Sequence, residues 1–536
     1  MKKHISGLLI LIISLLLVQC AKRGTPTGGL LDSIPPAFTK AAPENYSVNF
    51  NKKEIRIYFD EYIKLEKPQQ QIIISPPMAL KPDISPLGSA QKYIRIRLND
   101  SLQKNTTYAF NFGNSVVDNN EGNPLPYFKY VFSTGTYIDS LRLSGTVSDA
   151  LLKEANPFIS VMLYEVNEDF SDSLVYNDPP RYMTNTLDSL KTFELSNLKE
   201  GTYQLVAVQD LNNNYKYNPG KEKIAFIGKH IKIPSDTTYN LVLFREELAF
   251  KAERPKQEGL QKILIGHQGK VNLDSLKFKI LNVPTIDLDY RISKVTGKDS
   301  LYFWFKPELK TDSLLMQVTA PNRTDTLVTR ISEMPKDSLR ISFEPSGSLD
   351  FGNKVYLKSS TPLLEKNDSL IQILNKDSLA VNFSSEFIPY ENSVLLKFDQ
   401  NENEAYHITV LPGALTDFFS STNDTLSANL KTRAFSDYGN LILSLQNIRS
   451  FPIILQLTDE KGNIKAEKYS TSESNLRFEL ISPGKYLIRV IYDLNENGIW
   501  DTGNYLKKLK PEEIIYFPEP IEVRPNWDVN ETFILN

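Results

Sequence analysis

Short runs of alternating apolar and polar residues recur along almost the whole chain. In segments 54–59 (Glu-Ile-Arg-Ile-Tyr-Phe) and 93–98 (Tyr-Ile-Arg-Ile-Arg-Leu), every second side chain is apolar. A period of two places these side chains on one face of a β-strand, whereas an amphipathic helix needs a period near 3.6. Asn, Asp, Gly, Pro and Ser separate the runs, as they do in turns between strands. The pattern predicts an all-β protein whose helices are only short connectors.

The chain also contains internal repeats. Residues 201–214 and 484–497 share a Gly-x-Tyr and an Asp-Leu-Asn-x-Asn at identical spacing, and a Phe-Glu-Leu run precedes each. A weaker pair, 108–134 and 406–432, begins with a tyrosine, has an aspartate near its middle and ends with a threonine. Repeats of this kind set module boundaries. We therefore predict that two kinds of module each occur twice.

At 536 residues the chain is too long for one hydrophobic core, so it must form several domains. The repeats predict five β-sandwich domains after an N-terminal leader. The predicted segments are a signal peptide at 1–19, a lipidated tether at 20–33, and domains at 34–136, 137–247, 248–336, 337–435 and 436–536.

The N-terminus has the features of an export signal. Lys2 and Lys3 precede an apolar run over 5–18, which is too short to span a bilayer and suits a signal peptide. The sequence Leu17-Val-Gln-Cys20 resembles the lipobox of bacterial lipoproteins, in which the cysteine sulfur receives a diacylglyceryl group. Gln19 departs from the small residue usual there. Cys20 is the only cysteine, so we predict lipidation at Cys20 and no disulfide within the chain.

Segment 35–135 resembles the bacterial Ig-like domain of S-layer-protein type. The resemblance rests on Pro35-Pro36, Pro43-Glu-Asn45, Pro76-Pro77, the run 102–108, Val117-Asp118 with Gly122-Asn123, and Phe132-Ser-Thr-Gly135. Cys20 with the Gly- and Pro-rich stretch after it resembles the start of Ig-like lipoproteins of Bacteroidota. Both families imply structural or interaction modules, although a fold alone does not give an activity.

Domains 137–247 and 436–536 resemble carboxypeptidase-regulatory or transthyretin-like sandwiches. Their signals are the opening Leu-Ser-Gly-Thr-Val at 143–147, the Gly-x-Tyr and the Asp-Leu-Asn-x-Asn loop. This resemblance implies a second class of sandwich, while 248–336 is predicted as a β-sandwich of uncertain type. The fold class is thus tandem Ig-like and transthyretin-like sandwiches after a lipoprotein signal peptide.

Charge and residue types argue against several functions. The formal net charge is −3, which gives no electrostatic case for binding nucleic acid, since that normally requires a basic patch. Outside the leader only His230, His267 and His407 occur, far apart and in no zinc-binding pattern. No Gly-x-Ser-x-Gly elbow is present, so nothing indicates a catalytic triad. The sequence predicts neither an enzyme nor a required cofactor.

One loop has the oxygen spacing of a calcium site. Its candidate ligands at loop positions 1, 3, 5, 7 and 9 are Asp493, Asn495, Asn497, the carbonyl of Ile499, and Asp501. Position 12 is Asn504 rather than a bidentate acid. The corresponding loop 210–218 carries a lysine and lacks the glycine, and Glu222 could complete a site there only by another geometry. The alternative is a hairpin loop held by Asx turns without metal.

Asp-[Ser/Thr]-Leu occurs more often than composition would give by chance, and it resembles the O-glycosylation acceptor of Bacteroidota. The candidate acceptors are Ser101, Ser140, Ser173, Ser189, Ser275, Ser300, Ser313, Thr326, Ser338, Ser369, Ser378 and Thr425. Asp and Ser also end loops well, so turn chemistry explains the same pattern. An acceptor hydroxyl must lie on an exposed loop, so the two interpretations are compatible.

These features favour a non-enzymatic, lipid-anchored scaffold of the outer membrane that binds other envelope proteins. The alternatives are a carbohydrate-binding surface lipoprotein, which would use exposed aromatics such as Trp500, and a calcium-stabilised adhesin. Ala21-Lys-Arg23 lacks an acidic cluster after the cysteine, which favours the periplasmic face over the cell surface without deciding between them. The expected partners are the membrane, envelope proteins and, in the alternative, glycans.

Overall fold

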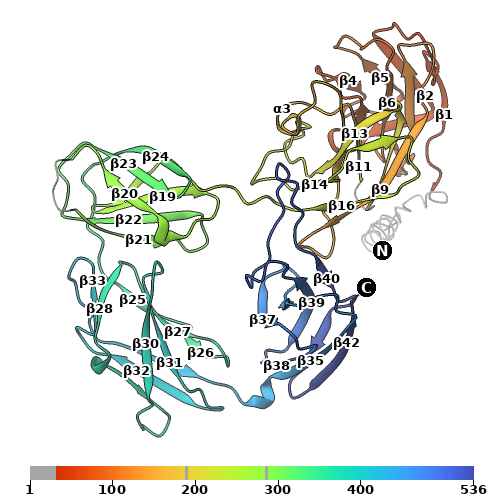
Figure 1. The fold of residues 1–536 in the computed structure, drawn as a ribbon. Helices are drawn as coiled ribbons and strands as arrows, with labels where there is room; N and C mark the ends of the chain where they lie inside the picture. The colour runs from red at the N-terminus through yellow and green to blue at the C-terminus, as the bar shows by residue number, and fades with distance from the viewer. Residues whose placement is uncertain (1–31, 187–190, 284–287, 536) are drawn as a thin grey trace, which may run out of the picture. The chain divides into compact units, whose positions relative to one another are not determined.

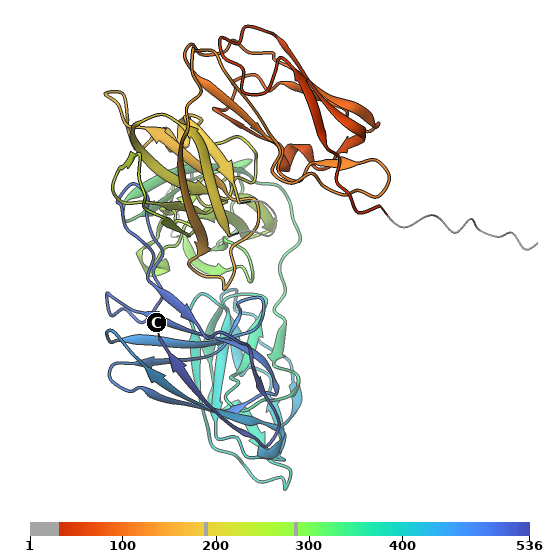
Figure 2. The same ribbon diagram turned by 90° about the vertical axis from the view of Figure 1, so that its right-hand side faces the viewer.

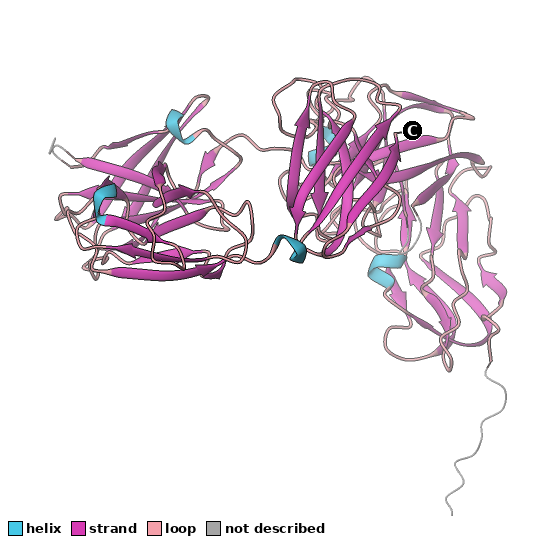
Figure 3. Cartoon of the chain, turned by 90° about the horizontal axis from the view of Figure 1, so that it is seen from below, coloured by secondary structure: helices cyan, strands magenta, loops and turns pink. Residues whose placement is uncertain are grey.

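The computed structural model describes residues 32–186, 191–283 and 288–535. The signal peptide, Cys20, most of the tether and Ser189 lie outside these ranges. Two compact units divide the chain, Met1–Ser140 and Leu141–Asn536. Strands dominate both units, and helices are single turns (Figure 3). The helical turns of the described residues are α2 Pro68–Gln71, α3 Leu174–Asn177, η1 Leu273–Ser275, η2 Asp368–Leu370 and η3 Phe435–Asp437. The all-β prediction is therefore confirmed.

The first unit is a sandwich of two antiparallel sheets (Figure 1, red to orange). Its strands are β1 Phe38–Ala42, β2 Glu54–Leu65, β3 Ile73–Ser75, β4 Asp83–Ser85, β5 Gln91–Arg97, β6 Thr107–Asn111, β7 Val116–Asp118 and β8 Lys129–Ser133. One sheet has the order β1-β2-β5-β4 with β7 on β2, and the other β3-β6-β8. The alternation predicted for 54–59 and 93–98 is observed, because Ile55, Ile57, Ile94 and Ile96 are all buried against the rings of β6 and β8.

Residues 141–244 and 439–534 fold with the same topology. Strands of the first copy are β9 Leu141–Asp149, β10 Ser160–Glu165, β11 Tyr182–Asn185, β12 Thr192–Leu198, β13 Gly201–Val208, β14 Ile224–Phe226, β15 Ile231–Ile233 and β16 Tyr239–Leu243. Those of the second are β35 Gly439–Gln446, β36 Ile453–Thr458, β37 Ile464–Ser470, β38 Asn475–Ile481, β39 Gly484–Tyr492, β40 Ile514–Tyr516, β41 Ile521–Val523 and β42 Asp528–Ile534. The repeated sequence thus encodes a repeated fold.

Strand order makes the correspondence explicit. The smaller sheet is β12-β9-β16 in the first copy and β38-β35-β42 in the second, and in each the last strand pairs in parallel with the first. The larger sheet is β11-β10-β13-β14 with β15 on β13, matched by β37-β36-β39-β40 with β41 on β39. Each copy encloses its own cluster of buried Leu, Ile, Val, Phe and Tyr side chains.

Residues 251–330, which follow the first copy, form another two-sheet sandwich. Its strands are β17 Lys251–Ala252, β18 Lys256–Gly259, β19 Lys262–Gln268, β20 Lys277–Ile280, β21 Asp289–Lys294, β22 Ser300–Lys306, β23 Ser313–Ala320 and β24 Arg323–Arg330. The sheets are β17-β19-β22-β21, with β18 on β19, and β20-β23-β24. Trp304 on β22 is 1% exposed, and its indole N–H donates to Ser293 Oγ at 2.9 Å.

Residues 341–431 repeat features of the first unit. The strands are β25 Ile341–Glu344, β26 Gly347–Ser348, β27 Val355–Ser359, β28 Leu363–Lys366, β29 Ile371–Leu374, β30 Phe383–Ile388, β31 Ser393–Phe398, β32 Ala405–Val410, β33 Leu415–Asp417 and β34 Leu426–Lys431. The Tyr406 hydroxyl accepts the N–H of Asn401 at 2.7 Å, just as Tyr108 accepts that of Gln103 at 2.9 Å. The weaker repeat in the sequence therefore has a structural counterpart.

In the part of the chain that the structure describes, each predicted sandwich contains a cluster of buried hydrophobic residues, and the five-domain division stays a prediction. The individual boundaries remain our proposal. The described residues include no helix long and apolar enough to cross a membrane.

Candidate functional site

An aspartate organises the loop after β13 and its counterpart after β39. The Asp210 carboxylate accepts the N–H groups of Asn212, Asn214 and Tyr215 at 3.2, 3.2 and 2.8 Å. The Asp493 carboxylate accepts those of Asn497 and Gly498 at 3.2 and 2.7 Å. Side-chain bonds of this kind let the backbone turn without strand pairing.

A buried glutamate closes each loop. Glu222 is 0% exposed and accepts the N–H groups of Leu211 and Asn218 at 3.0 and 2.9 Å. Glu512 accepts those of Leu494 and Asp501 at 2.8 and 3.0 Å, and burial raises the pKa of Glu512. From the sequence, Glu222 was considered only as a metal ligand, and the role of Glu512 in the second loop was not predicted. The distance along the chain from aspartate to glutamate differs between the copies, which hid the correspondence.

The predicted calcium ligands lie together in the second loop. Asp501 Oδ2 accepts the side-chain amides of Asn495 and Asn497 at 2.5 and 2.7 Å, and Asn497 Oδ1 accepts the N–H of Ile499 at 2.9 Å. The contact between Asn497 and Ile499 is that of an Asx turn, and together with the side-chain amide bonds it is compatible with the metal-free alternative. Among the described residues, no cluster of three or more His, Cys, Asp or Glu side chains is placed to hold a metal ion. Calcium binding at Asp493 and its neighbours stays a prediction.

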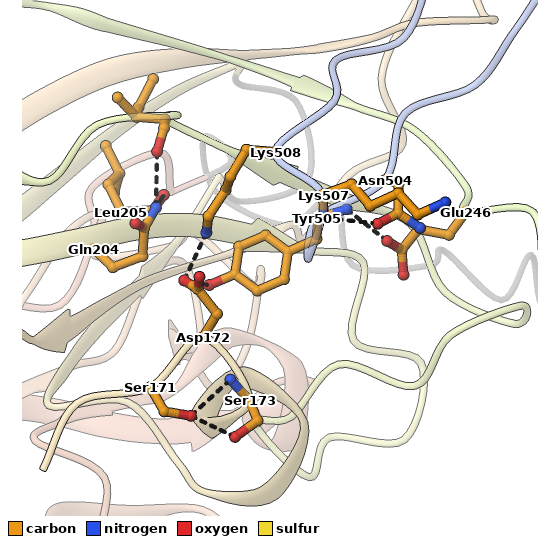
Figure 4. A network of polar contacts seen from close by, with 11 residues as sticks. Ser171, Asp172, Ser173, Gln204, Leu205, Glu246, Asn504, Tyr505, Lys507 and Lys508 are labelled. Carbon is orange, nitrogen blue, oxygen red and sulfur yellow. Dashed lines mark hydrogen bonds and ion pairs between the residues drawn. The ribbon is translucent and has the colours of Figure 1, made fainter.

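The second loop is longer than the first and reaches the other copy of the module. Its extra residues form a small hairpin in which Asn504 and Leu509 exchange backbone hydrogen bonds of 2.8 and 2.9 Å. Tyr505, at the hairpin tip, is 0% exposed, and its N–H donates to Glu246 Oε1 at 2.6 Å. Figure 4 shows this network, which also joins Lys508 to Asp172. Sequence analysis did not predict this contact.

Aspartates also organise the Ig-like loops. Asp118 is 2% exposed, and its carboxylate accepts four backbone N–H groups, from residues 120–123, at 2.7 to 3.1 Å. Asp417, its counterpart in the repeat, accepts the N–H groups of Phe419 and Ser421 at 2.9 and 2.7 Å. Burial alone would raise the pKa of Asp118, but the four donors outweigh it and the pKa is lowered.

A pH dependence follows for the loop at 118–123. Because the folded pKa lies below the ordinary 3.8, the loop gains stability from ionised Asp118 above that pH. The gain is lost as pH falls through the lowered pKa. We expect amide exchange of residues 120–123, corrected for intrinsic rates, to accelerate on acidification in the wild-type chain. Asp118→Asn should exchange faster at neutral pH and lose most of this dependence; equal pH profiles would contradict the assignment.

The predicted glycosylation acceptors differ in exposure. Eight of these residues are exposed in the structure: Ser101, Ser140, Ser173, Thr326, Ser338, Ser369, Ser378 and Thr425. Ser275, Ser300 and Ser313 are half-buried, and Ser189 lies outside the described residues. The exposed set satisfies the steric requirement of the hypothesis, and turn chemistry accounts equally for several positions. Modification of these residues therefore stays a prediction.

The histidines occupy separate places in the fold. The His230 ring contacts Phe170, His267 Nδ1 lies 3.1 Å from the carbonyl oxygen of Gly269, and His407 Nδ1 lies 2.8 Å from Asn429 Oδ1. These different partners give no shared centre. Trp500, the suggested ligand platform, is half-buried, and its indole N–H donates to the carbonyl of Glu512 at 3.0 Å.

Comparison with known proteins defines the class of the first domain. Residues 32–134 match the family described as bacterial Ig-like domain. The resemblance of 35–135 to this family is confirmed, and the chain is a multi-domain β-sandwich protein with repeated domains. No curated protein matches the sequence.

Several solved structures match the chain at low similarity. A crystal structure of the S-layer protein rSbsC(31-844) has 12% identity and a TM-score of 0.16, covering 91% of this chain and 67% of its own. A glycan-utilization protein of Bacteroides ovatus, SGBP-B in complex with a mixed-linkage heptasaccharide, has 10% identity and a TM-score of 0.17, covering 71% and 93%. Titin domains I67–I69 have 11% identity and a TM-score of 0.11, covering 54% and 99%. Such scores carry no functional argument.

Proposed function

We propose that this protein is a non-enzymatic scaffold of a Gram-negative cell envelope, anchored by lipid on Cys20, that binds other envelope proteins. The observation that carries the proposal is the series of sandwiches beginning with a bacterial Ig-like domain directly after a lipobox-like cysteine. Loop tips and exposed strand edges on such sandwiches supply recognition surfaces without catalytic groups. The resemblance of the segment from Cys20 onward to lipoproteins of Bacteroidota supports an anchor in the outer membrane, on its periplasmic face or at the cell surface.

Intact-mass measurement of the protein from its native host tests the anchor. We expect a mature chain beginning at Cys20 with the added mass of acyl chains, and partition into detergent during phase separation. Several acyl chains give durable attachment, because each buried methylene contributes about 0.8 kcal/mol. A Cys20→Ser chain should keep its leader or leave the membrane fraction. A wild-type chain that is unacylated and freely soluble would contradict the proposal.

The same spectrum tests the proposed glycosylation. We expect additional mass in sugar increments beyond that of the acylated chain, and we expect it to be lost when the exposed Asp-Ser-Leu serines are replaced by alanine.

Crosslinking in native membranes would then identify protein partners. Glycan binding is the second candidate, and the half-buried position of Trp500 gives it less support than the scaffold function. Retention of the chain on immobilised polysaccharide, rather than crosslinks to proteins, would favour glycan binding instead.

A further inference from the structure

The loop after β13 in the first copy and the corresponding loop after β39 in the second differ by one insertion. Each loop runs from an aspartate to a buried glutamate that accepts two backbone N–H groups. In the first copy the N–H donor Asn218 lies 4 residues before Glu222. In the second copy the corresponding donor, Asp501, lies 11 residues before Glu512, so this loop has seven additional residues. These are residues 502–508, which we call the latch hairpin. The loop is otherwise held in the same way, so the insertion serves something other than the loop itself.

The latch hairpin contacts the first copy in a pocket. We call the residues that it contacts the acceptor pocket: Asp172 and Tyr176 from α3 and the loop before it, Phe226 from β14, and Phe244 and Glu246 from the segment after β16. The Tyr505 ring lies edge-on to Phe226, with centroids 5.3 Å apart, and 6.1 Å from Tyr176. A tyrosine with 0% exposure that is carried by a hairpin and surrounded by another domain's side chains acts as an anchor.

Polar contacts fix the register of this anchor. Lys508 Nζ donates to Asp172 Oδ1 at 2.6 Å and lies 4.1 Å from the centroid of the Tyr505 ring. The Thr502 hydroxyl donates to the carbonyl of Arg245 at 2.7 Å. Both copies belong to the second compact unit, although Tyr505 and its partner Glu246 are 259 residues apart in sequence. Figures 1 and 2 both show the blue hairpin against the olive strands.

A second set of contacts lies beside the hairpin. Arg489 is 4% exposed, and its guanidinium donates to the carbonyl of Leu151 at 3.0 Å. The Tyr516 hydroxyl donates to the same carbonyl at 2.6 Å. Alignment on the shared Gly-x-Tyr puts Val206 of the first copy where Arg489 stands in the second. The second copy therefore carries features directed at the first, and the first lacks them.

Gly503 shows how closely the two copies approach. A Cβ added at this position would lie 2.8 Å from two ring atoms of Phe244, and 2.7 Å from the carbonyl oxygen of Leu509. Contacts below 3.0 Å require a neighbour to move, so a branched residue here would push the hairpin out of the acceptor pocket. The small residue is thus needed both for the backbone of the hairpin, at Leu509, and for its close approach to Phe244.

We propose that residues 502–508 are an intramolecular latch, which ties the last sandwich of the chain to the acceptor pocket on the 137–247 sandwich. The two sandwiches are then joined twice, once through the polypeptide of residues 248–435 and once through the noncovalent contact of the latch. The latch makes the four sandwiches of Leu141–Asn536 hold one arrangement, with the anchor tyrosine and its lysine as the specific determinants. This proposal does not depend on the lipid anchor or on any partner.

Distance measurement in the full chain tests the latch. Nitroxide labels on Glu168→Cys and Glu519→Cys, both at exposed positions, report the separation of the two copies in a Cys20→Ser background. We expect one narrow distance distribution for the otherwise wild-type chain. Gly503→Val, and separately deletion of 502–508, should broaden it and shift it to longer distances. Leu506→Ala, which changes a hairpin residue that is 57% exposed, is the matched control and should leave it unchanged.

Charge exchange separates latch opening from misfolding. Lys508→Asp should broaden the distribution and accelerate amide exchange of Tyr505 by about tenfold or more, because its protection depends on docking. Adding Asp172→Lys should restore both readings, which no misfolded domain would do. Unchanged distances in Gly503→Val and in the deletion would overturn the proposal. So would a wild-type dimer that becomes monomeric in Gly503→Val, since it would place the contact between chains.

Discussion

Replacing Phe132 with alanine is expected to destabilise the first unit by about 3 to 5 kcal/mol, the usual cost of emptying a phenylalanine site in a core. Phe132 is 0% exposed on β8. Its ring stacks on Phe50 with centroids 3.9 Å apart and is 5.4 Å from the ring centroid of Tyr108. Pulse-labelled hydrogen exchange in a urea series, read on peptides of residues 38–133, measures the loss without contributions from the other sandwiches.

Phe38→Ala is the matched control, because it removes the same atoms from a ring that is 39% exposed on the edge strand β1. Its cost should be below about 1.5 kcal/mol, since much of that ring already meets water. Equal shifts of the urea midpoint in the two variants would mean that Phe132 is not at the centre of this core.

Glu222→Ala is expected to cost about 3 kcal/mol in the first transthyretin-like copy. The change leaves the N–H groups of Leu211 and Asn218 without their acceptor. An unsatisfied donor costs about 1 to 3 kcal/mol when it is buried, and these two donors are only partly buried, so each should contribute near the lower end of that range. Native-state hydrogen exchange of β13 and β14 should therefore accelerate by roughly 100-fold, since 1.4 kcal/mol is tenfold in an equilibrium constant.

Lys221→Ala serves as the neighbouring control, because that side chain is exposed, and its exchange should match wild type. Glu222→Gln should fall between the two variants, since an amide keeps one acceptor oxygen but presents an N–H₂ group to the other donor. If Glu222→Ala exchanges like Lys221→Ala, the glutamate does not hold the loop.

Strand periodicity and internal repetition predicted the architecture well, because both depend on local residue order. Ile55, Ile57, Ile94 and Ile96 alternate in the sequence and are buried as alternation requires. The Asp-Leu-Asn-x-Asn signature likewise identified two loops that have the same hydrogen-bonding plan in the structure.

The contact between the repeats could not be predicted in that way. Tyr505 lies in a short polar segment, Thr-Gly-Asn-Tyr-Leu-Lys-Lys, which has the composition of an exposed loop. Its burial is created by Asp172, Phe226 and Glu246, which are hundreds of residues away and show no pattern shared with it. Comparing the spacing from the Asp-Leu-Asn-x-Asn signature to the next glutamate in the two repeats would have exposed the seven-residue insertion. The role of Glu512 was missed for the same reason, since the insertion moved it out of register with Glu222.

The parallel pairing of first and last strands has a mechanical consequence. In the 137–247 sandwich, β16 runs beside β9 in the same direction, with Tyr239 opposite Gly145 and Leu243 opposite Asp149. The chain therefore enters this sandwich at one end and leaves it at the other. Tension between the two ends would shear all five paired positions at once instead of peeling them apart in turn. A sandwich that is pulled at its two ends resists rupture through this geometry, since several hydrogen bonds must fail together.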